Sequence, residues 1–98
     1  EVQANRGLLL SLTGDHASAV AAFEEALRYA PNQPVIHSYL AEALAHDGPQ
    51  RDLVRALREA RRAVALGGSD AASLRTLSAI CRASGREDCL PAPAVPGR

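Results

Sequence analysis

The chain has 98 residues, a formal net charge of zero from 11 basic and 11 acidic residues, and 47% hydrophobic residues. This length corresponds to one small domain, which excludes an enzyme with a cleft between two domains. The hydrophobic fraction excludes an intrinsically disordered chain, and zero net charge removes the long-range field that draws nucleic acids to their binding proteins. No stretch is apolar for the length of a membrane span, so we expect a soluble chain. Because it begins with Glu1 rather than Met, we expect a processed chain or an excised piece.

The apolar residues are mostly Ala and Leu, and only Phe23, Tyr29 and Tyr39 are aromatic. Small side chains let helices pack closely against one another, so this composition favours an all-α protein.

Two helices are predicted in the first third of the chain. The first covers residues 3–12 and ends at Gly14, because glycine is typical of the position after a helix. Asp15 is a predicted N-cap for the second helix, which ends before the turn at residues 31–34 because two prolines there prevent its continuation.

Three further helices are predicted over residues 35–46, 51–66 and 71–83, each followed by a turn that contains glycine. Apolar residues recur at helical spacing in each of them, and no segment alternates with a period of two. The fold class predicted is therefore all-α. Residues 91–98 contain three prolines without apolar periodicity and are predicted to form an extended, Pro-rich tail.

The spacing of the turn glycines indicates an internal repeat. Gly14 and Gly48 are 34 residues apart, and Gly48 and Gly85 are 37 apart, which indicates an insertion of three residues near Pro49. A two-helix unit of about 34 residues is typical of an α-solenoid. The predicted repeat domain covers residues 1–90, with repeats over about 1–33 and 34–70 and a partial third over 71–90.

The residues within each unit follow a shared pattern. The first unit reads Gln3-x2-Arg6-Gly7-x2-Leu10, then Gly14-Asp15, Ala19-x3-Phe23-x2-Ala26-Leu27 and Pro31. The second contains His37-x2-Leu40-Ala41-x2-Leu44 and ends with Gly68 in place of Pro, and the third has only its first helix. This pattern resembles the tetratricopeptide repeat (TPR), although Gln3 and Arg6 stand where bulky apolar residues are usual.

The resemblance covers residues 3–85 and implies antiparallel helix hairpins stacked as a short right-handed α-solenoid of about two and a half repeats. In such a fold, small residues such as Gly7 and Ala19 let the two helices of a hairpin approach closely. Larger residues such as Leu10 and Phe23 fill the spaces between neighbouring hairpins.

TPR domains present the first helix of each hairpin on a concave groove that binds a peptide or a partner helix. The resemblance places nine residues on this groove: Asn5, Leu8 and Leu12, then Ser38, Tyr39 and Glu42, and finally Arg75, Ala79 and Arg82. The set is apolar at one end and basic at the other, and Tyr and Arg often anchor interfaces. It favours a partner with an apolar end and an acidic end; the alternative is that these are ordinary exposed residues of a small scaffold.

A basic strip follows the fourth predicted helix, at Arg51, Arg55, Arg58, Arg61 and Arg62. It would suit phosphates or an acidic partner. The alternative is a solvated face on which Arg55, Glu59 and Arg62 form ion pairs at helical spacing. Because no aromatic residues are interleaved with the arginines, nucleic acid is not an expected partner.

No nucleophile and base, phosphate-binding loop or cofactor motif can be recognised, so we predict no catalysis, no cofactor and no small-molecule substrate. His37 and His46 are nine residues apart, which is not the spacing of a metal-binding pair on a helix, and no metal site is predicted.

Cys81 and Cys89 allow two interpretations. A disulfide between them would close a short loop, tie the C-terminal segment to the last helix and indicate an oxidising compartment such as a periplasm. Two free thiols, with Cys81 a small core residue, would fit a cytoplasmic protein.

The sequence therefore favours a protein-interaction scaffold that binds another protein or a peptide. The alternatives are an accessory or regulatory segment of a larger enzyme or of a transport or secretion assembly, and a structural module that associates with itself through its end faces.

Overall fold

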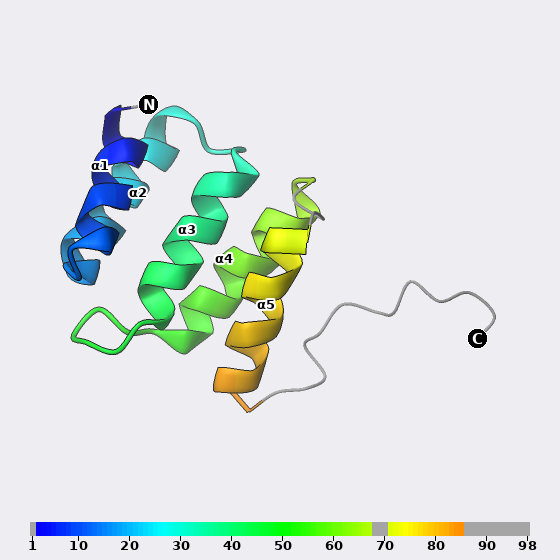
Figure 1. The fold of residues 1–98 in the computed structure, drawn as a ribbon. Coiled ribbons are helices and arrows are strands. Elements are labelled where there is room, and N and C mark those ends of the chain that lie inside the picture. The colour runs from blue at the N-terminus through cyan, green and yellow to red at the C-terminus, as the bar shows by residue number, and fades with distance from the viewer. Residues whose placement is uncertain (1, 68–70, 86–98) are drawn as a thin grey trace, which may run out of the picture.

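The computed structural model describes residues 2–67 and 71–85, and within them every regular element is an α-helix (Figure 1). The elements are α1 (Val2–Leu12), α2 (His16–Tyr29), α3 (Pro34–Ala45), α4 (Leu53–Ala65) and α5 (Ala71–Ala83). The predicted all-α class and the order of the predicted helices are confirmed.

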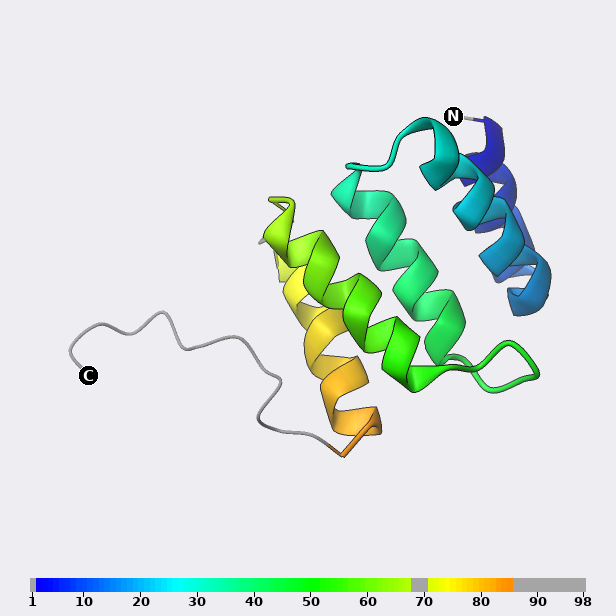
Figure 2. The ribbon, with the colours of Figure 1, turned by 180° about the vertical axis from the view of Figure 1, so that it is seen from behind.

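The helices form antiparallel hairpins that stack side by side. α1 packs against α2, and α3 packs against α4; α3 also contacts α1, α2 and α5. Figures 1 and 2 show α1, α3 and α5 on one side of the stack and α2 and α4 on the other. The stack therefore has one face made by the first helices of the units and an opposite face made by the second helices.

Local sequence signals explain where the helices begin and end. Asp15 accepts a hydrogen bond from the backbone N–H of Ser18 at 3.2 Å and caps α2. Asp52 caps α4 in the same way, with the N–H of Arg55 at 3.1 Å, so this helix begins at Leu53, two residues later than predicted. Gly14 has a φ of 90°, a left-handed conformation that lets the chain turn back directly after α1.

Close packing in the first hairpin depends on Gly7. A Cβ atom at this position would lie 2.6 Å from Cε1 of Phe23, so only glycine leaves room for the aromatic ring. Phe23 is completely buried and also stacks against Tyr39, with ring centroids 5.7 Å apart. Phe23 thus joins the first hairpin to α3.

The second hairpin is packed with smaller side chains. Ala41 on α3 and Ala56 on α4 are completely buried, and Ala60 is nearly so. Leu40 and Leu44, both buried, complete this part of the core.

The insertion between α3 and α4 is held against the end of α3 by hydrogen bonds. Gln50 Nε2 donates to the carbonyl oxygens of Ala43, at 3.0 Å, and His46, at 2.8 Å. The backbone N–H of Asp52 donates to the carbonyl of Leu44 at 2.9 Å. The longer turn therefore satisfies carbonyl groups at the end of α3 and keeps the two helices in register.

The predicted tail over 91–98 and the last residues of the predicted third repeat lie outside the described residues, as does the turn at 68–70. None of the five helices is both long enough and apolar enough to cross a membrane.

Candidate interaction surface

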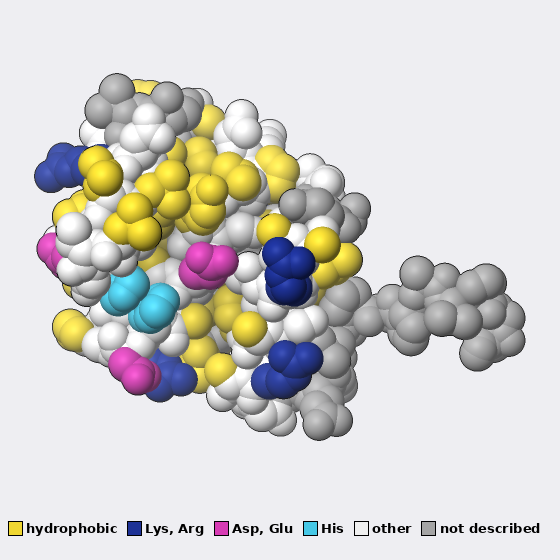
Figure 3. Space-filling view, viewed as in Figure 1, with side chains coloured by type: hydrophobic (Ala, Val, Ile, Leu, Met, Phe, Trp, Pro, Cys, Tyr) yellow, Lys and Arg dark blue, Asp and Glu magenta, His cyan; other side chains and the backbone are white. Residues whose placement is uncertain are grey.

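The nine residues predicted to line a groove belong to α1, α3 and α5, which share one face of the stack. Figure 3 shows this face, with hydrophobic side chains gathered over α1 and α3 and basic side chains over α5. α3 lies between the other two helices, and α1 and α5 do not touch each other. The apolar and basic ends of the predicted set therefore lie at opposite edges of the face.

A groove runs between α3 and α5 and has a volume of about 430 Å³. It is lined by Glu42, Ala45, His46, Ala72, Arg75, Thr76, Ala79 and Ile80. We call it the α3–α5 groove. It brings together three of the nine predicted residues, namely Glu42, Arg75 and Ala79.

The polar side chains of the α3–α5 groove are partly organised. Thr76 Oγ1 donates a hydrogen bond to Glu42 Oε2 at 3.0 Å, which links the two walls. Arg75 and Arg82 are exposed and form no ion pair with any other described residue. Their positive charge is therefore available to a ligand at this edge of the face.

The remaining predicted residues have different environments. Asn5 is exposed on α1, while Leu12 is 83% exposed and Leu8 is half-buried against the core. Tyr39 is half-buried at the centre, where it stacks on Phe23. These residues offer apolar surface at the α1 side, outside the α3–α5 groove.

Ser38 differs from the others because it is buried, with 7% of its surface exposed. Its Oγ lies 3.3 Å from Oγ of Ser73, also buried, so the pair forms a polar contact between α3 and α5. Ser38 therefore contributes to the packing beneath the face and offers almost no surface to a ligand.

Sequence reasoning did not include several groove residues, among them Ala45 and His46 at the end of α3. The repeat register indicates which positions share a face, but not which residues of neighbouring helices meet across it. His46 stacks on His16, with ring centroids 3.8 Å apart and planes 6° from parallel. This contact joins the start of α2 to the end of α3, at one end of the groove.

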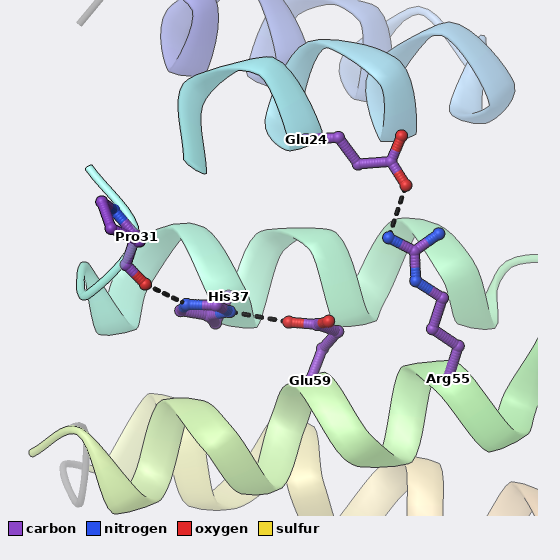
Figure 4. Close-up of polar contacts among 5 residues, drawn as sticks. All are labelled: Glu24, Pro31, His37, Arg55 and Glu59. Carbon is purple, nitrogen blue, oxygen red and sulfur yellow. Dashed lines mark hydrogen bonds and ion pairs between the residues drawn. The ribbon is translucent and has the colours of Figure 1, made fainter. Parts of the chain in front are cut away.

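A buried polar cluster lies between α3 and α4 (Figure 4). His37 Nε2 donates to the carbonyl oxygen of Pro31 at 2.7 Å, because a carbonyl oxygen can only accept. His37 Nδ1 lies 2.6 Å from Glu59 Oε1, and the two side chains are 6% and 15% exposed. Both ring nitrogens thus have a partner. The cluster attaches α4 to the turn that precedes α3. We call it the His37–Glu59 clamp.

The arginines of α4 are paired differently from the sequence-based expectation. Arg55 forms an ion pair with Glu24 on α2, and Glu59 contacts His37, so the predicted pairing of Arg55 and Glu59 is wrong (Figure 4). Both side chains instead reach across to other helices, Arg55 to α2 and Glu59 to α3.

Cys81 is completely buried on α5, and no cysteine among the described residues is a free thiol. Cys89 lies outside the described residues, so the Cys81–Cys89 bridge stays a prediction. In the part of the chain that the structure describes, no three His, Cys, Asp or Glu side chains come together in a group that could hold a metal ion.

Comparison with known proteins agrees with the hairpin geometry. Residues 1–33, which comprise α1, α2 and the turn that follows, match the family model described as tetratricopeptide repeat. No curated protein matches the chain with significance. The first hairpin is therefore similar to a tetratricopeptide repeat, a kind of repeat that generally serves as a protein-interaction module.

Proposed function

We propose that the face made by α1, α3 and α5 binds a peptide or a helix of a partner protein, without catalysis by this chain. The observation that carries the proposal is the α3–α5 groove, in which the exposed Arg75 lies beside apolar Ala79 and Ile80. Such a mixture of apolar floor and a few polar groups is typical of binding grooves.

The charge distribution favours a particular orientation of the ligand. Arg75 and Arg82 have no acidic partner among the described residues, so an acidic side chain or a terminal carboxylate of the ligand is expected at the α5 edge. At the α1 edge the exposed Leu12 and half-buried Leu8 suit an apolar residue of the ligand. The proposed ligand is therefore apolar at one end and acidic at the other.

A displayed library of random peptides would test the proposal. Peptides are selected on the whole chain, and the dissociation constant of the consensus peptide is measured by fluorescence anisotropy. We expect the combined change Arg75→Glu and Arg82→Glu to weaken binding roughly tenfold or more, because it replaces attraction by repulsion.

The matched control reverses the charge of two exposed arginines on the opposite face, Arg28→Glu on α2 and Arg62→Glu on α4. It changes net charge by the same amount and should leave binding within about twofold, because screening weakens charges more than about a Debye length away. A library without binders, or equal weakening by both double variants, would contradict the proposal.

A further inference from the structure

A second groove lies at the other end of the stack, between the first half of α4 and the end of α5. Its volume is about 540 Å³, and it is lined by Leu53, Val54, Leu57, Arg58, Arg61, Ala83 and Ser84. We call it the end groove. It shares no lining residue with the α3–α5 groove and lies outside the face proposed to bind the partner.

The position of the end groove follows from the stacking of the hairpins. α1 is followed by α2, and α3 by α4, and each second helix packs against the first helix of its own unit and of the next. α5 is the first helix of the third unit, and the described residues contain no second helix of that unit. The end groove is therefore the place beside α4 and α5 where the chain following α5 would continue the stack.

The end groove has an apolar floor and a basic rim. Val54 is 78% exposed, and Leu53 and Ala83 lie near it in the lining. Arg58 and Arg61 are exposed and form no ion pair with any other residue that the structure describes. An occupant with acidic residues next to an apolar one would fit both parts.

We propose that the occupant is the segment of this same chain that follows α5, residues 87–90. Its sequence is Glu87-Asp88-Cys89-Leu90, an acidic pair followed closely by a leucine. The acidic pair has the charge opposite to that of the arginine rim, and the leucine supplies an apolar side chain for the floor.

The reach of the chain is sufficient for this contact. Ala83 and Ser84 line the end groove, and Gly85, with a φ of 73°, lets the chain reverse directly after them. Five residues beyond Gly85 span at most about 17 Å. The floor from Leu53 to Arg61 is only about 12 Å long at the rise of an α-helix. Leu90 can therefore reach the part of the floor that lies beside Ala83 and Ser84.

A single tryptophan would report on the contact, because the natural chain contains none. In the full chain carrying Leu90→Trp, we expect emission at a shorter wavelength and weaker quenching by acrylamide than in an isolated peptide of residues 86–98 with the same change. Adding Val54→Asp should shift the emission toward that of the peptide, because it places a charge on the apolar floor.

The matched control is Val35→Asp, on α3 outside the end groove. Val35 is 54% exposed, so neither aspartate is forced into the core, and far-UV circular dichroism checks that each variant remains helical. The control should leave the emission unchanged. Charge reversal by Arg58→Glu and Arg61→Glu should act in the same direction as Val54→Asp.

Three results would overturn the proposal. The emission could equal that of the free peptide, or it could be shifted but insensitive to Val54→Asp. A shift that grows with protein concentration would instead assign the end groove to a second copy of the chain. The series is run with and without reductant. This separates the effect of a bridge from Cys89 to Cys81 from that of the apolar and ionic contacts. The proposal requires the emission shift, and its sensitivity to Val54→Asp, in both conditions.

Discussion

The first and second hairpins have the same arrangement of helices but are held together by different interactions. In the first, Gly7 on α1 leaves room for the ring of Phe23 on α2. At the matching positions the second hairpin has Ala41 and Ala60, both buried. The two helices of the second hairpin therefore meet at these positions through small side chains, without a ring.

The second hairpin instead contains the His37–Glu59 clamp. In the first hairpin, Gln3 stands at the position of His37 and Ala22 at the position of Glu59. A clamp of this kind is therefore impossible in the first hairpin. The comparison teaches that the same hairpin arrangement can be held together either by an aromatic ring packed over glycine or by a buried polar contact. It also fits the match of the family model to residues 1–33, where the Gly and Phe of the repeat pattern are present.

The largest expected effect comes from removing the ring that holds the first hairpin. Phe23→Ala should lower the free energy of unfolding by about 3–5 kcal/mol, because a fully buried aromatic side chain leaves a cavity. Urea unfolding followed by circular dichroism measures this. A loss below about 1 kcal/mol, the usual size for an ordinary substitution, would mean that the ring does not hold the hairpin.

The next effect concerns the His37–Glu59 clamp. His37→Ala should cost about 2–4 kcal/mol, because it leaves the mostly buried Glu59 carboxylate and the Pro31 carbonyl without their partner. Glu59→Ala added to His37→Ala should cost much less than it does alone, since the contact is already lost. As a control, Arg55→Ala breaks a more exposed ion pair with Glu24 and should cost less than about 1 kcal/mol. Additive costs for His37 and Glu59 would contradict the clamp.

The third unit contains neither a second described helix nor a polar clamp, and the predicted Cys81–Cys89 bridge would compensate for this. Reduction should lower the free energy of unfolding by roughly 2–3 kcal/mol, because the bridge closes a short loop. Thiol titration in denaturant without reductant should find no free thiol. Two free thiols per chain would remove the bridge.

Exchanging the small residues of the two hairpins gives the smallest effect and the sharpest comparison. Gly7→Ala should cost about 1–2 kcal/mol, because its Cβ would meet the Phe23 ring. In the second hairpin, Ala41→Gly should cost about 0.5–1 kcal/mol through helix propensity, with a further contribution from lost packing. If Gly7→Ala stabilised the chain, as helix propensity alone predicts, the close approach to Phe23 would not limit this position.

Much of the fold could be predicted from local signals. The capping residue Asp15, the glycines after the helices and the prolines before α3 place all five helices, with boundaries within about two residues of those observed. The boundary of α4 differs most, because the sequence pattern predicts Asp52 within the helix, whereas its side chain caps the helix. Caps act within a few residues, so one sequence contains the information needed to find them.

Contacts between helices could not be predicted in the same way. Periodicity places Glu59 on α4 but does not say that it reaches His37, 22 residues earlier in the chain. The candidate groove shows the same limit: Arg75, Ala79 and Glu42 all line the α3–α5 groove, but the repeat register does not indicate that Ser38 is buried against Ser73. Which side chains meet depends on the offset and crossing of the helices, which arise from packing of the whole stack.

The central claim, that α1, α3 and α5 form the binding face, is tested most directly by NMR titration of the isotope-labelled chain with a peptide from the library. We predict that backbone amide shifts change mainly in α1, α3 and α5, with the largest changes near Arg75 and Ala79 in the α3–α5 groove. Shifts concentrated on α2 and α4, with those two residues unaffected, would contradict the account.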